Sequence, residues 1–166
     1  MSITLNKFLP ERKEFVIPCP LKPPATKKDI IRYAKRLAGI MCAREGVPPP
    51  RDVIVRASVK PRKDSNYRWF LSRPVGGVYD YFNERIVIAK WVVDIYLTLP
   101  EHEKYKYFCD YLVEIISHEA THHIQFKKLG REESLRRHKT SELEEEAYDV
   151  GGEMSKECFK RCIYKR

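Results

Sequence analysis

One helix-like stretch, "EIISHEATHHIQF" (Glu114–Phe126), constrains this chain more than any other segment. It holds three of the five histidines, and no proline interrupts it. His118 and His122 are four residues apart, so on a helix their imidazoles project from one face, one turn apart. That spacing suits a single zinc ion, and Glu119 would lie beside the metal, where it can take a proton from water.

The alternative is a polar helix face that carries unrelated histidines. The flanking residues favour the metal site, because Ile115, Ile116 and Ile124 are apolar, as expected of a helix buried around its ligands. His123 lies off the ligand face, so we expect it at the surface or behind the ligands.

The remaining pattern predicts an α+β domain, a small sheet with helices packed on it. A proline-rich arm, 1–26, precedes a single domain, 27–166. The predicted elements are a helix from residue 27 to Gly46 capped by Thr26, a strand in 51–59, a hairpin with strands 78–81 and 85–89, a helix over 101–129, a polar connection over 131–140, and a helix over 141–162.

A third metal ligand is expected from the last helix, which offers Glu142, Glu144, Glu145 and Glu146. At about 100° per residue, Glu145 faces solvent, while Glu144 and Glu146 border the buried face on opposite sides. Small residues at 147 and 151 would let this helix approach the histidine helix closely. A capping box with Ser141 competes for Glu144, so the helix phase leaves Glu144 and Glu146 open.

Three segments together resemble a known family. "IISHEATHHI" is similar to the active-site helix of the zincin metallopeptidases, and "GVYDYFNERIVIA" is similar to the strands that precede it in compact gluzincin-like members. "ELEEEAYDVGG" resembles the Glu-x-x-Ala helix that supplies their third ligand. The combination, over roughly residues 75–155, resembles the minigluzincin type, and the metzincin extension with its third histidine is absent.

The resemblance implies a zincin-like fold, in which a small mixed sheet with an exposed edge strand packs on the active-site helix. It implies a zinc metalloendopeptidase that acts on a protein or peptide substrate. One catalytic zinc would be held by His118, His122 and Glu144, with Glu119 as general base, and the Glu-x-x-Ala phase selects Glu144. Tyr148 and His138 are both candidates to stabilise the oxyanion.

The charge distribution suggests a second partner. The formal net charge is +9, and basic residues cluster in 1–36, 60–73 and 155–166. Such surfaces favour polyanions such as nucleic acid, bound without sequence preference, although they also serve only to keep a protein in solution. Two alternative functions follow: a DNA-associated regulatory zincin that cuts a specific protein partner, and a non-catalytic zinc-stabilised binding module.

The cysteines and the apolar pattern bear on location. Five cysteines cannot all pair within one chain. Cys158 and Cys162 lie one helical turn apart, which suits a shared metal, a redox pair or, as we favour, two small buried side chains. Residues 1–25 show no signal peptide, and no long apolar run suggests a transmembrane helix, so we predict an intracellular, cytoplasmic protein without a membrane partner. The oligomeric state is left open.

Overall fold

The computed structural model describes residues 17–57, 76–138 and 142–163. Its elements, in chain order, are α2 (Lys27–Arg44), β1 (Asp52–Arg56), β2 (Gly77–Asp80), β3 (Arg85–Ala89), α3 (Lys90–Thr98), α4 (Glu101–Tyr107), the π-helical turn η2 (Phe108–Val113), α5 (Glu114–Leu129), α6 (Arg131–His138), α7 (Glu142–Cys158) and the π-helical turn η3 (Phe159–Ile163). The architecture is α+β, as predicted. The basic loop predicted at 60–73 lies outside the described residues.

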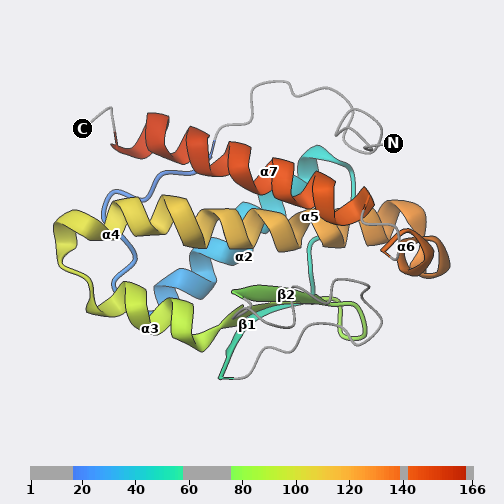
Figure 1. Ribbon diagram of the computed structural model, residues 1–166, viewed down its shortest axis with the longest axis horizontal. Helices are drawn as coiled ribbons and strands as arrows, with labels where there is room; N and C mark the ends of the chain where they lie inside the picture. Colours follow the sequence, from blue (N-terminus) through green and yellow to red (C-terminus); the bar gives the residue numbers. More distant parts are fainter. Residues whose placement is uncertain (1–16, 58–75, 139–141, 164–166) are drawn as a thin grey trace.

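Helix α5 lies at the centre of the molecule (Figure 1). The sheet lies on one side of it, α7 runs along another side, and α2 passes behind it. Most of α5 is therefore covered, and every residue from Ile116 to Gln125 is buried. A helix buried on several faces must satisfy its polar side chains within the protein. The histidine-rich sequence of α5 thus needs polar partners from its neighbours.

The sheet is small and mixed. Its order is β1-β3-β2, with β1 parallel and β2 antiparallel to β3. The predicted hairpin is confirmed, because β3 has the expected bounds and β2 begins one residue earlier than expected. Its turn is held by the Asp80 carboxylate, which accepts hydrogen bonds from the backbone N–H groups of Phe82 and Asn83. Among the described strands, β2 is an outer strand.

Strand β2 lies unusually close to α5 because it begins with glycine. A Cβ atom on Gly77 would come within 2.6 Å of Ile115 Cγ2 and 3.2 Å of the Val87 carbonyl oxygen. Only a residue without a side chain fits that gap. The same position lies 3.5 Å from Glu119 Cγ, so this contact brings the edge of the sheet against the histidine motif.

The helices follow the sequence prediction with two differences. Helix α2 is capped as expected, since the Thr26 hydroxyl accepts a hydrogen bond from the Asp29 N–H. The connection predicted over 131–140 is wrong in part, because it contains α6, where Glu133 pairs with Arg136 and Arg137 one turn later. Helix α3 was not predicted.

No helix within the described ranges is long and apolar enough to cross a lipid bilayer.

Residues 17–25 of the proline-rich arm lie against the helices. The hydroxyls of three tyrosines from separate helices donate to prolyl carbonyl oxygens of the arm: Tyr33 to Pro18 at 2.9 Å, Tyr105 to Pro20 at 2.8 Å and Tyr96 to Pro24 at 2.7 Å. Ile17 is buried in the core. The arm forms no strand or helix here, so side-chain donors satisfy backbone carbonyls that secondary structure would otherwise satisfy.

The cysteines correct the sequence interpretation. Cys158 and Cys162 are both buried, as favoured, but they are neither a shared metal site nor a redox pair with each other, because they form disulfides with Cys109 and Cys19, respectively. Cys42 is free and buried, and burial raises the pKa of its thiol to about 12. Pairing depends on distance in space, which a local spacing in the sequence does not reveal. The Cys19–Cys162 disulfide ties the arm to η3.

We expect one reactive thiol per chain in denaturant without reductant, and five after reduction. Replacing Cys19 and Cys162 by alanine should lower the free energy of unfolding by roughly 2–4 kcal/mol, because the disulfide restricts a long loop of the unfolded chain. Thiol titration and urea denaturation measure both quantities. Unchanged stability of the double variant in the absence of reductant would show that the Cys19–Cys162 disulfide contributes little to the stability of the folded state.

Candidate metal centre

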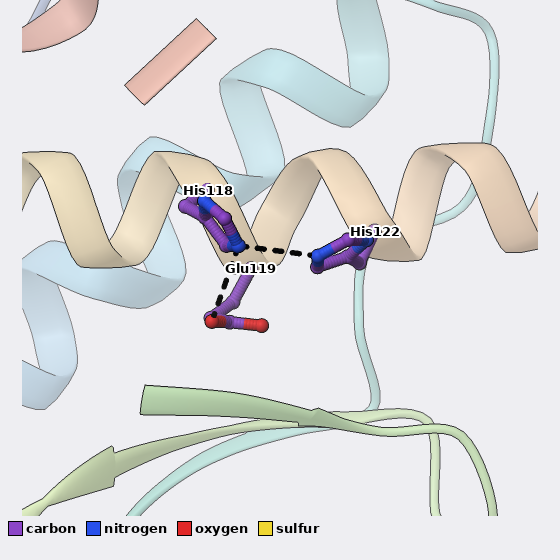
Figure 2. Close-up of side chains that lie close together, drawn as sticks. All are labelled: His118, Glu119 and His122. Carbon is purple, nitrogen blue, oxygen red and sulfur yellow. Dashed lines mark hydrogen bonds and ion pairs between the residues drawn. The ribbon is translucent and has the colours of Figure 1, made fainter. Parts of the chain in front are cut away.

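Three polar side chains of α5 meet near the sheet. One donor atom from each of His118, Glu119 and His122 lies within 4.8 Å of the others. The two Nε2 atoms are 3.2 Å apart, and Figure 2 shows the imidazoles directed toward one another, with Glu119 on the side of the strands. All three residues are buried. A buried group of this composition could bind a metal ion.

Helix α7 adds a carboxylate to this group. Glu144 Oε1 lies 2.7 Å from His122 Nε2, and Glu144 Oε2 lies 3.4 Å from His118 Nε2. Burial raises the pKa of Glu144, but the charges and hydrogen bonds of the two imidazoles outweigh burial and hold that pKa well below its usual range. Glu145 is exposed, as the helix phase predicts. The structure therefore brings Glu144 to the histidines.

The approach of α7 depends on a second glycine. A Cβ atom on Gly151 would lie 3.1 Å from the Glu114 carbonyl oxygen and 3.6 Å from His118 Cβ. Ala147, one turn earlier, is fully buried. The expectation that small residues let the two helices approach closely is confirmed. A larger residue at 151 would push α7, and Glu144 with it, away from the imidazoles.

Glu119 faces the sheet. Its Oε1 lies 3.8 Å from His118 Nε2, and it accepts a hydrogen bond from the backbone N–H of Tyr79 in β2. Burial, with a smaller contribution from the negative charge of Glu144, raises the pKa of Glu119 to about 8. A carboxyl group with a pKa near neutrality can both accept and release a proton.

Sequence reasoning missed Gln125. Its side chain is fully buried, and its Oε1 lies 2.9 Å from His122 Nδ1. Its amide nitrogen donates to the Leu143 carbonyl at 3.1 Å and to Glu146 Oε1 at 3.2 Å, which are both in α7. Two acceptors fix the amide nitrogen on that side, so Oε1 must face the histidine and accept from Nδ1–H. The only available signal was a polar residue one turn beyond His122 in an otherwise buried run.

The Gln125 contacts have two consequences. With its proton on Nδ1, His122 presents the Nε2 lone pair to Glu144, so a cation or a proton is needed between the two acceptors. Glu146 accepts from the Gln125 amide through its Oε1 atom. Gln125 therefore orients one candidate ligand and also fixes the register of the helix that carries another.

His123 corrects an expectation. We expected it at the surface or behind the ligands, but it is fully buried and faces another part of the fold. Its Nε2 donates to the Pro48 carbonyl at 2.8 Å, and its Nδ1 accepts from the Tyr79 hydroxyl at 2.7 Å. Pro48 accepts through an oxygen that cannot donate, so the tautomer follows from the partners. His123 thus helps to hold β2 on α5.

Of the two candidates for stabilising an oxyanion, Tyr148 contacts a histidine of the motif. The ring of Tyr148 packs edge-on against His118, with centroids 4.6 Å apart, and its side chain is partly exposed. Tyr148 lies on α7 one turn after Glu144, so it borders the candidate metal centre. The side chain of His138 lies outside the described residues.

No family model, curated protein or solved structure matches this chain. The zincin resemblance therefore still depends on the motifs, and the assignment of His118, His122 and Glu144 as ligands stays a prediction.

We expect Glu144→Gln to weaken zinc binding strongly, because it removes the negative charge that faces both imidazoles. Glu146→Gln should have little effect on zinc affinity, since glutamine keeps an oxygen that can accept from Gln125. Competition with a chromogenic chelator measures both affinities. If the two variants show the opposite order, Glu146 is the ligand and Glu144 is not.

We expect Gln125→Leu to lower zinc affinity by about 10–100-fold, because His122 loses the acceptor that fixes its tautomer. It should also destabilise the fold by roughly 1–3 kcal/mol through unsatisfied buried groups. Thr121→Val is the matched control. Thr121 is buried on the same helix, and its hydroxyl donates to the Ser117 carbonyl at 2.7 Å, so loss of that hydroxyl should affect stability alone. Equal zinc affinity in the two variants would contradict the orienting role.

Proposed function

We propose that this protein is a zinc-dependent metalloendopeptidase with a zincin-like fold of the minigluzincin type. One observation carries the proposal. Inside the protein, the Nε2 atoms of His118 and His122 lie 3.2 Å apart, and each has one Glu144 oxygen within 3.4 Å. The carboxyl group of Glu119 lies beside them, with its Oε1 atom 3.8 Å from His118 Nε2.

The residues present fit zinc. Two neutral imidazoles and one carboxylate form a common catalytic zinc set, which leaves a position for water or substrate. Gln125 already holds His122 in the tautomer that offers Nε2. The bound metal would supply a Lewis acid that makes water more acidic and polarises a carbonyl group.

The remaining chemistry belongs to side chains and backbone of this chain. Glu119 would accept a proton from the attacking water and pass it to the leaving amine. Tyr148, partly exposed beside His118, is the described candidate to donate a hydrogen bond to the oxyanion. An extended peptide would pair with the outer edge of β2 by strand addition, which places its scissile bond along α5. The substrate is therefore proposed to be an unfolded or extended segment of a protein.

The intracellular location is likewise a proposal. Two disulfides are more usual in oxidising compartments, with proteins of hyperthermophiles as the main intracellular exception. The redox state of Cys19 and Cys109 in the producing cell distinguishes a reducing cytosol from an oxidising compartment. A reducing cytosol would leave both residues as thiols.

We expect Glu119→Gln to keep stoichiometric zinc while hydrolysis of a denatured protein substrate falls by about 100-fold or more, because the general base is lost. His118→Ala and His122→Ala should lose the metal as well as the activity. The control is Glu145→Gln, which removes a solvent-exposed carboxylate from α7.

Unchanged activity of Glu119→Gln would contradict its catalytic role. Full zinc occupancy in the wild-type protein without hydrolysis of any denatured substrate would favour a non-catalytic, zinc-stabilised binding module.

A further inference from the structure

Basic side chains gather on the exposed face of α2. Lys28, Arg32, Lys35 and Arg36 are all exposed and fall within an arc of roughly 100° around the helix. The opposite face carries buried residues such as Ala34, Leu37 and Ala38 and packs into the core. These four residues, with residues 17–25 of the adjoining arm, form the α2 basic face. Ion pairs with Asp29 and Asp52 engage Arg32 and Lys35, respectively, but both pairs are solvent-exposed.

The α2 basic face continues into a groove between α2 and the proline-rich arm. The groove has a volume of about 330 Å³, and its lining includes Lys22 from the arm as well as Arg32 and Arg36 from α2. Among its described lining residues, Asp29 is the only carboxylate, so the groove keeps a positive balance. The wall formed by the arm is held in place by the tyrosine hydroxyls and the Cys19–Cys162 disulfide. The groove is therefore a preformed concave site.

Tertiary structure joins two basic clusters that are far apart in the sequence. The Cα atoms of Cys19 and Cys162 are 5.4 Å apart, so the start of the described chain and its end lie together. Lys160 and Arg161 precede Cys162 in η3, so the disulfide brings this basic segment to the arm. Both side chains also form ion pairs with Glu157.

We infer that the α2 basic face and its groove bind the phosphodiester backbone of a nucleic acid. From Lys28 to Arg36 the helix rises about 12 Å, which matches the rise of three or four phosphates of one strand measured along a duplex axis, at about 3.4 Å each. A rigid row of cations beside a groove suits a regular, linear polyanion. The ring of Tyr33 is buried, and its hydroxyl is bonded to Pro18, so it offers no surface on which a base can stack. Binding is therefore independent of sequence.

An anionic membrane fits the same surface less well. Peripheral binding to lipid needs apolar side chains that enter the bilayer, in addition to cations. Leu21, which is 90% exposed, is the large apolar side chain that the arm presents near this groove. A single leucine contributes little to insertion, and a lipid surface does not require a groove.

The nucleic-acid surface and the candidate metal centre are separate. In Figure 2 α2 runs behind α5, whereas the side chains of His118, Glu119 and His122 lie in front of it. A strand bound to the α2 basic face would thus leave the metal centre uncovered. This inference does not depend on the proposed peptidase activity.

The test measures binding of the full chain to fluorescently labelled DNA by anisotropy over a series of salt concentrations. Single-stranded and duplex DNA of the same sequence, and a scrambled sequence, are compared. The triple variant Lys28→Ala, Arg32→Ala and Arg36→Ala should bind about tenfold more weakly or worse, and its salt slope should fall by about 2–3. All three positions are exposed, and circular dichroism verifies that the variant is folded.

The matched control removes the same charge elsewhere. Lys90, Lys106 and Lys156 are exposed and lie on α3, α4 and α7, so their triple alanine variant should keep DNA affinity within about twofold. Equal losses in the two triple variants would overturn the inference, because net charge alone would then explain binding. So would the absence of DNA binding at low salt.

Vesicles containing phosphatidylserine provide the remaining comparison. Tighter binding to vesicles than to DNA, lost on Leu21→Ala, would overturn the inference in favour of a membrane surface. His118→Ala should bind DNA like the wild-type chain whether or not the peptidase proposal holds.

Discussion

The close contact between α5 and α7 is the constraint on which the candidate metal centre depends. A single absent side chain, at Gly151, lets α7 lie against the turn that carries His118. Gln125 then bonds across the interface to the Leu143 carbonyl and to Glu146, which fixes how α7 is rotated. Only with that rotation does Glu144 face the imidazoles. The candidate metal centre is thus a property of helix packing, in which one helix would supply the histidines and another the carboxylate.

The opposite side of α5 is defined by β2 in a similar way. Gly77 lets the strand lie directly on the helix, and the bond between His123 and Tyr79 holds it there. The Tyr79 backbone N–H can then reach Glu119. Buried polar groups on α5 are therefore satisfied by the elements that cover it, as buried polar groups generally must be. The three polar residues of the motif, His118, Glu119 and His122, would be costly in this position without those partners.

The arm and the cysteines show how the ends of the chain contribute. Tyrosine hydroxyls and a disulfide fix a segment that has no regular secondary structure. This arrangement turns proline-rich sequence into one wall of a basic groove on the side of α5 away from the histidines. The candidate metal centre and the α2 basic face can consequently be studied independently, since different helices form them.

Local sequence determined much of the fold. Alternating β-branched residues predicted the strand in 51–59, Thr26 and Gly46 marked the ends of α2, and the spacing of His118 and His122 placed both imidazoles on one face. These features depend on residues within one or two turns of each other. The short helix α6 was missed because its stability comes from ion pairs of Glu133 in a strongly polar segment, where hydrophobic periodicity gives no signal.

Only the tertiary structure decided which residues meet across the chain. The helix phase left Glu144 and Glu146 both open, because each borders the buried face of α7, and the rotation of that helix depends on Gln125 and Gly151. The partners of Cys158 and Cys162 lie 49 and 143 residues away, which no local spacing reveals. His123 is buried because Tyr79 and Pro48 happen to converge on it. A sequence pattern specifies the face of an element, whereas the contact partner of that face is set by packing of the whole chain.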